Sequence, residues 1–265
     1  FLSFFLSFFY FLFFLKKKSG MDNSPMYYDS FGPGQGASWD DVSNRVQLFD
    51  VQHSALFVAE SNALQQLARA AGAPAKVVAE LRAQGQEIAG LINELLWDNA
   101  TGIYRQRDAS GQQLGFSPSV SPTSFYPMLA GIATPAQVDR LLADHLLSAS
   151  GFGVGVAGTP FFLPSISRDN PAFFDNNYWR GRAWGPLHLL TWLSLSNYIG
   201  QPGVAAARRA LSDQAAQLLL GDWLSLRQVH ENYNATLGTG NDVINSNPFY
   251  HWGANLAYIK LREQY

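Results

Sequence analysis

Two carboxylate residues stand in short segments that combine aromatic and amide side chains. Asp22 lies in SGMDNSPMYY, and Glu231 lies in HENYNATLGTG with Tyr233 two positions later. Two carboxyl groups on opposite sides of a glycosidic bond can cleave it, because one protonates the leaving oxygen while the other activates water or attacks the sugar. Aromatic surroundings assist the acid, since burial keeps a carboxyl group protonated nearer neutral pH. These residue types therefore favour hydrolysis of a glycoside.

Spacing along the chain does not by itself select these two residues. Asp22 and Glu231 stand near opposite ends of the sequence, so only the fold can bring them together. Asp22 would equally suit the cap of a turn or helix, and Glu231 would suit a solvated loop. Five further aspartates compete for the same roles: Asp29, Asp50, Asp169, Asp175 and Asp242.

An aromatic and cationic cluster lies between the two carboxylates, in the segment Asn176–Leu190, which reads NNYWRGRAWGPLHLL. Its aromatic and cationic members are Tyr178, Trp179, Arg180, Arg182 and Trp184. Indole faces can contact the C–H face of a sugar ring, and a guanidinium offers fixed hydrogen-bond donors to its hydroxyls. Core tryptophans beside an arginine that caps a loop would give a similar pattern. The density of such residues favours a sugar-binding site.

Composition excludes several other classes of function. The 265 residues are 47% hydrophobic and 14% charged, which is typical of a domain with a large core. The formal net charge is −2 and no basic patch stands out, so we expect no nucleic-acid partner. Cysteine is absent and the five histidines lack metal-ligand spacing. We therefore expect no metal and no cofactor.

Apolar residues recur at helical spacing along most of the chain. We expect seven helices, at about 44–71, 75–97, 122–132, 134–146, 186–199, 204–226 and 249–261. Pro186 suits the first turn of its helix, where the missing N–H costs nothing. Residues 98–115 break the pattern with turn signals, so we expect a loop or a small hairpin there.

Short joins alternate with long polar loops, notably 150–177 and 230–248. Loops of this length in a compact domain are usually functional. Their alternation with short joins predicts that they gather at one end of a helical toroid. That end would then carry the suggestive segments 19–30, 117–126, 175–182, 231–242 and 250–252.

The first 15 residues, FLSFFLSFFYFLFFL, are almost entirely Phe and Leu, and Lys16–Lys18 follow them. The run is shorter than the about 20 apolar residues of a membrane span, and it lacks the small-residue cleavage site of a signal peptide. We interpret residues 1–18 as lying outside the domain 19–265, because Phe, Leu and Ser all have pyrimidine-only codons, as in translated non-coding sequence. A genuine anchor would instead imply a membrane contact and the secretory pathway, as in the endoplasmic reticulum.

Four motifs, taken in order, resemble the catalytic half of glycoside hydrolase family 63. They are SGMDNSPMYYDS, NNYWRGRAWGP, HENYNATLGTG and FYHWGA, and the likeness runs from about Ser19 to Tyr258. That family includes processing α-glucosidase I, bacterial α-glucosidases and mannosylglycerate hydrolases. The resemblance implies an all-α fold, an (α/α)6 toroid of which about seven of twelve helices are represented. The first hairpins and any N-terminal sandwich domain are not among them, which would leave apolar helix faces exposed.

The resemblance also implies roles. Asp22 matches the general acid and Glu231 the general base of an inverting enzyme that acts on α-linked glucosyl or mannosyl units of oligosaccharides or small glycosides. The positions that hold sugar or line the pocket match Asn23, Tyr178, Trp179, Arg180, Gly181, Trp184, Tyr233, His251 and Trp252. Two alternatives stay open. One is a non-catalytic carbohydrate-binding toroid or inactive fragment, and the other is a trehalase or glucoamylase-like hydrolase.

Overall fold

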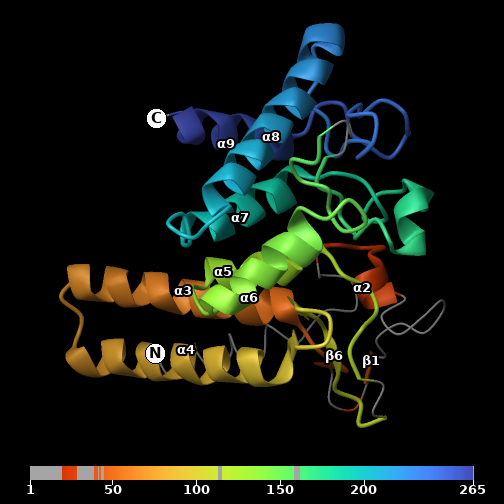
Figure 1. Ribbon diagram of the computed structural model, residues 1–265. Coiled ribbons are helices and arrows are strands. Elements are labelled where there is room, and N and C mark those ends of the chain that lie inside the picture. Colours follow the sequence, from red (N-terminus) through yellow and green to blue (C-terminus); the bar gives the residue numbers. More distant parts are fainter. Residues whose placement is uncertain are drawn as a thin grey trace.

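The computed structural model describes residues 20–28, 39–40, 42, 45–112, 115–157 and 162–264. The Phe-rich start and Asp29 lie outside these ranges. Helices dominate the described part of the chain (Figure 1). None of the described helices combines the length and the hydropathy that crossing a membrane requires.

Each of the seven expected helices is present, some of them with a 3-10 or π segment at one end. The α-helices are α2 (Pro25–Tyr28), α3 (Val51–Ala70), α4 (Ala75–Leu95), α5 (Tyr126–Leu129), α6 (Pro135–Arg140), α7 (Gly185–Ser196), α8 (Val204–Leu226) and α9 (Ala254–Gln264). The 3-10 segments are η1 (Pro122–Phe125), η3 (Pro171–Asp175) and η4 (His251–Gly253), and the π segment is η2 (Leu141–Leu146). The prediction that Pro186 occupies the first turn of its helix is confirmed.

The start of the first long helix differs from the expectation. We expected helix from about residue 44, but α3 begins at Val51, where the Asp50 carboxylate accepts a hydrogen bond from the amide of His53 at 2.8 Å. The residues before Asp50 form strands instead. β2 (Arg45–Val46) pairs with β1 (Trp39–Asp40), and β3 (Leu48–Phe49) pairs with β6 (Arg107–Asp108), each antiparallel. Backbone pairing therefore overrides the local helical pattern, and the partner of β3 lies far along the chain.

The break in the pattern after α4 is a small hairpin, as expected. β4 (Trp97–Asp98) pairs antiparallel with β5 (Ile103–Tyr104). The Asp98 carboxylate stabilises the turn, because it accepts hydrogen bonds from the amide of Ala100 at 3.0 Å and from the hydroxyl of Thr101 at 2.5 Å.

Helix α7 lies at the centre of the described helices and packs against α5, α8 and α9. Glu263 on α9 joins these helices, since its carboxylate accepts hydrogen bonds from Trp192 Nε1 on α7 at 2.8 Å and from Arg208 on α8 at 2.9 Å. The Arg208 guanidinium also lies 4.1 Å from the centre of the Trp192 ring. A cation on an indole face adds to the packing of the helices.

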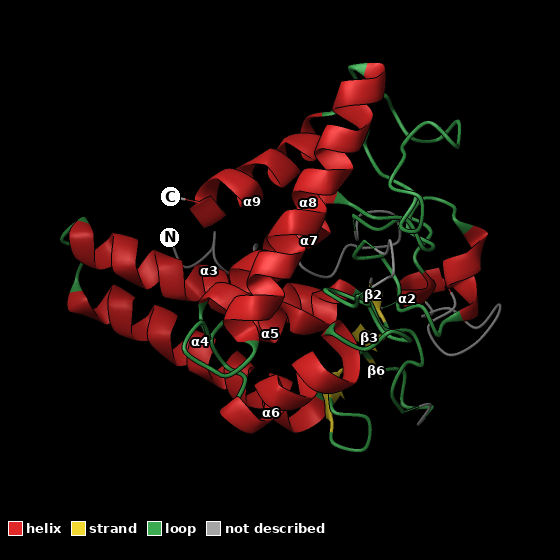
Figure 2. Ribbon diagram, turned by 45° about the horizontal axis from the view of Figure 1, so that its top comes forward, coloured by secondary structure: helices red, strands yellow, loops and turns green. Residues whose placement is uncertain are grey.

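The long loops gather on one side of the molecule, as the alternation of loop lengths predicted. Figure 1 shows α2, the loop after η2 and the loop after α8 on the right, whereas the tight α3–α4 join lies on the left. The view of Figure 2 shows the same separation. This side therefore holds the segments that carry the candidate site.

One face of the α8–α9 pair stays open to solvent. It carries large apolar side chains that are at least 44% exposed: Leu220, Trp223, Leu224, Tyr258 and Leu261. A hollow of about 650 Å³ lies on this face and extends to Tyr250 and His251. Exposed apolar helix faces of this kind are what we expected for a partial toroid.

Candidate active site

The segment that carries Asp22 is fixed to the domain from both sides. The flanking Met21 and Met26 are buried. The Asn23 side chain reaches the next loop, where its Oδ1 accepts a hydrogen bond from the amide of Trp179 at 2.9 Å and its Nδ2 donates to the carbonyl of Asn177 at 3.1 Å. Asp22 itself remains exposed. Its carboxyl group is therefore held at the surface beside the loop that contains Tyr178.

The loop 176–184 has an unusual backbone. The amides of Asn177 and Arg180 each donate to the other's carbonyl at 3.0 Å, which closes a tight turn. Asn176 and Tyr178 adopt positive φ values of 45° and 56°, and Gly181 has a φ of 98°. A positive φ is strained for a bulky residue such as Tyr178, and such strain is concentrated at functional sites.

The loop that carries Glu231 pairs with this strained loop through the backbone. The Ala183 amide donates to the Tyr233 carbonyl at 2.7 Å, and the Tyr233 amide donates back to the Ala183 carbonyl at 2.9 Å. On its other side, the amide of Glu231 donates to the carbonyl of Asn247 at 2.8 Å. Two segments therefore hold the backbone around Glu231.

Tyr178 connects the two carboxylates. Its hydroxyl donates to Glu231 Oε1 at 3.1 Å. Burial raises the pKa of Tyr178, and the negative charges of Glu231 and Asp22 raise it further. Both carboxylates therefore act on one phenol, although they stand near opposite ends of the chain. Tyr250 adds to the same effect and belongs to the same cluster.

Aromatic rings form a layer behind Tyr178. Trp179 and Trp184 stack with ring centres 3.7 Å apart and planes 5° apart. Trp252 meets both rings edge-on, at 6.3 and 5.7 Å, and Tyr250 meets Trp252 at 5.2 Å. Trp184 Nε1 also donates to the carbonyl of Tyr178 at 3.1 Å. The stacked indoles therefore support the strained loop from below.

Burial divides the predicted sugar-binding residues into two groups. Trp184 and Tyr233 are 0% exposed, Trp179 is 3% exposed, and Gly181 is buried. These four residues lie within the wall of the cluster, and their contact with a sugar stays a prediction. Tyr233 accepts a hydrogen bond from the amide of His230 at 3.1 Å through its hydroxyl. Sequence could not separate rings that face a pocket from rings that support one.

The other predicted binding residues are accessible. His251 is exposed, and Asn23, Tyr178, Arg180 and Trp252 are partly exposed. Arg180 Nε donates to Asp175 Oδ2 at 2.6 Å, which holds the guanidinium beside the strained turn. A guanidinium can donate hydrogen bonds to the hydroxyls of a sugar.

Most of the competing aspartates have other partners. Asp175 pairs with Arg180, and Asp242 pairs with Arg182 at 2.8 Å. Asp50 accepts hydrogen bonds from His53 and from the hydroxyl of Tyr27. Asp169 is exposed and lies outside the contacts described above. Asp22 and Glu231 are the two carboxylates whose negative charges raise the pKa of Tyr178.

Two residues of the cluster were not among the predicted site residues. Arg182 belongs to the aromatic and cationic cluster of the sequence but has no predicted role there, and the structure buries it between the two loops. Tyr250 directly precedes the predicted His251 and Trp252, and its signal in the sequence was its place in the motif FYHWGA.

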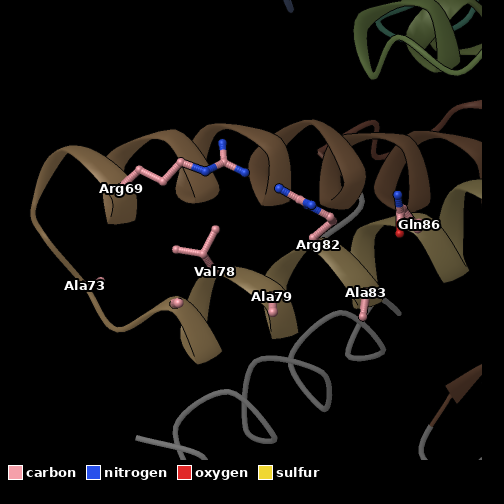
Figure 3. Close-up of a pocket in the computed structure, with 8 residues that line it drawn as sticks. Arg69, Ala73, Val78, Ala79, Arg82, Ala83 and Gln86 are labelled. Carbon is pink, nitrogen blue, oxygen red and sulfur yellow. The ribbon is translucent and has the colours of Figure 1, made fainter.

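A second hollow, of about 510 Å³, lies in the α3–α4 hairpin, away from both carboxylates. Figure 3 shows Arg69 on α3 and Arg82 on α4 extending toward one another along it. The other residues that line it are mostly alanines, so it lacks the carboxylates and rings that sugar chemistry requires. Among the described residues, no three His, Asp or Glu side chains are placed to hold a metal ion.

Comparison with known proteins identifies the fold. The chain aligns with the structure of a GH63 mannosylglycerate hydrolase from Thermus thermophilus in complex with glucose, at 22% identity and a TM-score of 0.69, over 92% of this chain and 60% of that one. It also aligns with the neutral trehalase of Saccharomyces cerevisiae, at 14% identity and a TM-score of 0.64, over 92% of this chain and 44% of that one. These likenesses confirm the expected (α/α) toroid.

Sequence comparison identifies the family. A probable trehalase of Eremothecium gossypii is 30% identical over 151 residues, which are 56% of this chain and 19% of that protein. The chain thus spans less than a fifth of this relative. Residues 12–252 match the family model described as the mannosylglycerate hydrolase MGH1-like glycoside hydrolase domain. Because that match covers most of the sequence, the chain belongs to the MGH1-like glycoside hydrolases of family 63.

Proposed function

We propose that this chain carries the catalytic centre of an inverting glycosidase that removes α-linked glucosyl or mannosyl units. The observation that supports this most strongly is the hydrogen bond from Tyr178 to Glu231, on a phenol whose pKa the charge of Asp22 also raises. Membership of a glycoside hydrolase family supplies the reaction class, and the two carboxylates supply the groups that the reaction needs.

The roles of the two carboxylates are assigned from the resemblance, in which Asp22 matches the general acid and Glu231 the general base. Asp22 is exposed at the surface, where it can reach the leaving oxygen of a bound glycoside. Glu231 is partly buried and accepts a hydrogen bond from Tyr178, which keeps an ionised carboxylate in one orientation. In this proposal Asp22 protonates the leaving oxygen, and Glu231 removes a proton from the attacking water. Inversion requires the two carboxyl groups to stand about 6.5–9.5 Å apart, to leave room for that water.

Two substrates are favoured by particular relatives. The matching family model is named for mannosylglycerate hydrolase, so mannosylglycerate is the first compound to test. The match to a probable trehalase makes trehalose the second. Hydrolysis rates on a panel of these two compounds together with simple α-glucosides and α-mannosides will show which substrate the chain prefers.

The test of the mechanism uses isosteric substitutions in the full chain. Asp22→Asn and Glu231→Gln should each lower kcat by at least about 1,000-fold, because each removes a group that transfers a proton in the rate-determining step. Asp169→Asn is the matched control, since it removes an exposed carboxylate elsewhere and should leave kcat unchanged. NMR of the first-formed product should show the β-anomer.

Specific results would overturn the proposal. Substantial hydrolysis by either Asp22→Asn or Glu231→Gln would refute the assignment of roles. Binding of the glycosides without hydrolysis by the unaltered chain would instead select the non-catalytic sugar-binding protein. A product that keeps the α configuration would exclude inversion.

A further inference from the structure

Arg182 is a charged residue without access to solvent. Its side chain is 0% exposed, which is rare for arginine unless every donor is paired. Its Nη2 donates to Asp242 Oδ1 at 2.8 Å, and its Nη1 donates to Asp242 Oδ2 at 3.2 Å. Nη1 also donates to Asn176 Oδ1 at 3.1 Å, and Nε donates to Asn232 Oδ1. The guanidinium is therefore held by three different residues.

These partners belong to the two loops that form the candidate site. Asn176 lies two residues before Tyr178, and Asn232 directly follows Glu231. Asp242 binds both loops as well, since its Oδ2 accepts hydrogen bonds from the side-chain Nδ2 atoms of Asn176 at 3.0 Å and of Asn234 at 2.7 Å. One arginine and one aspartate thus join the Tyr178 segment to the Glu231 segment.

The Asp242 carboxylate is held in its ionised form by the groups around it. Burial acts to raise the pKa of Asp242, but hydrogen bonds from Arg182, Asn234 and Asn176 outweigh it and lower that pKa to about 2. A planar guanidinium with donors in fixed directions can serve Asp242 in bidentate fashion while Nε serves Asn232. A lysine has one nitrogen and cannot make this set of contacts.

We propose that Arg182, through Asp242 and Asn232, is a positioning residue that holds Glu231 against Tyr178. This inference rests on the proposed role of Glu231 as the base. Arg182 itself is sealed from solvent and does not touch the substrate. Its effect is to fix the neighbouring backbone, so that the carboxylate of Glu231 keeps the position at which it can reach water. A displacement of about 1 Å can lower a rate by about 100-fold.

The test uses variants that preserve side-chain size. Asp242→Asn replaces one carboxylate oxygen by an NH₂ group, which faces donors of Arg182, Asn176 or Asn234. It therefore breaks the hydrogen bonds that join the two loops while the size of the side chain stays the same. Arg182→Lys keeps the positive charge but loses the planar guanidinium and its separate donors. The matched control is Glu263→Gln, because Glu263 forms a comparable pair with Arg208 at 2.9 Å, between α8 and α9. All three are made in the full chain.

We expect Asp242→Asn to lower kcat by at least about 10-fold with KM within about 3-fold of the unaltered chain, because orientation of the base is lost and sugar contacts remain. Arg182→Lys should give an intermediate kcat, because it restores the charge but not the geometry. Glu263→Gln should leave kcat within about 2-fold of the unaltered chain, even if it lowers the melting temperature as much as Asp242→Asn does. Equal kcat losses in Asp242→Asn and Glu263→Gln would reduce Arg182 to a structural role and overturn the proposal.

A second readout does not depend on hydrolysis. The amides of Glu231, Tyr233 and Asn234 donate hydrogen bonds within this region, so their hydrogen exchange reports whether the loop is held. Exchange at residues 231–234 should accelerate by at least about 10-fold in Asp242→Asn and stay unchanged in Glu263→Gln. Unchanged exchange in Asp242→Asn would refute the positioning role, whereas absence of hydrolysis by the unaltered chain would refute only the proposed function.

Discussion

Removing the hydroxyl of Tyr178 isolates the contact on which the site depends. Tyr178→Phe keeps the ring, which packs edge-on against Trp184 with centres 4.9 Å apart, and deletes the hydrogen bond to Glu231 Oε1. The backbone strain at residue 178 is the same in both forms, because phenylalanine and tyrosine have the same requirements at φ 56°. Any change in rate therefore reports the loss of one contact.

The size of the effect follows from the geometry. A hydrogen bond to a charged acceptor contributes roughly 1.5–3 kcal/mol, which corresponds to about a 10-fold to 160-fold change. The 3.1 Å separation and partial exposure of Tyr178 place this contact near the lower end. We expect kcat/KM to fall by about 10-fold to 30-fold. The fall should appear mainly in kcat, because the hydroxyl orients Glu231 rather than the sugar.

The assay is steady-state hydrolysis of the best substrate from the panel, with thermal unfolding of the same samples. Tyr198→Phe is the matched control, because the hydroxyl of Tyr198 donates to the carbonyl of Ala133 at 2.8 Å, between the turn after α7 and the turn before α6. That substitution should cost about 1 kcal/mol of stability and leave kcat unchanged. If Tyr178→Phe retains kcat within about 2-fold, Tyr178 does not orient the base and the reasoning fails.

Three further predictions concern the surroundings of the site. Gly181→Ala should lower the free energy of unfolding by about 3 kcal/mol or more in denaturant titrations, because its Cβ would overlap the carbonyl of Phe173 at a φ of 98°, whereas Gly200→Ala has open space and should not. Burial lowers the pKa of His188 to about 4, despite a hydrogen bond to a backbone carbonyl, so on acidification the unfolded chain binds the proton before the folded chain does. The free energy of unfolding should therefore fall by on the order of 3 kcal/mol from about pH 6.5 to pH 4, and His188→Gln should remove most of this pH dependence. Asn23→Ala breaks both hydrogen bonds to the loop 177–179 and should lower kcat by about 10-fold, and an unchanged kcat would show that this loop holds Asp22 in no useful position.

The sequence was sufficient to predict the helices because their signals are local. Apolar periodicity, Pro186 and the glycine-proline joins each act within a few residues, and all seven expected helices are present. The start of α3 was wrong for the opposite reason. The strand at Leu48–Phe49 exists because it pairs with Arg107–Asp108, and no local pattern reports a partner so far along the chain.

The candidate site shows the same limit. Residue types and family motifs indicated Asp22, Glu231 and the aromatic segment. In the structure Tyr178 donates a hydrogen bond to Glu231, and the charge of Asp22 also raises the pKa of Tyr178. Residue types and motifs could not indicate which rings face outward, because a stacked pair such as Trp179 and Trp184 has the same composition as a sugar platform. The burial of Arg182 could not be predicted from the sequence either, since its partners Asn232 and Asp242 lie 50 and 60 positions later in the chain.

The contact between Asn23 and the amide of Trp179 spans 156 positions, and the Glu231 loop follows later still. A ribosome must therefore release residue 231 before Asp22 and Glu231, the proposed acid and base, can meet. Until then the growing polypeptide carries Asp22 without Glu231 and could not perform the proposed hydrolysis. Proteolysis within the loop 230–248 would likewise disturb the Glu231 segment, although most of the described helices lie outside that loop.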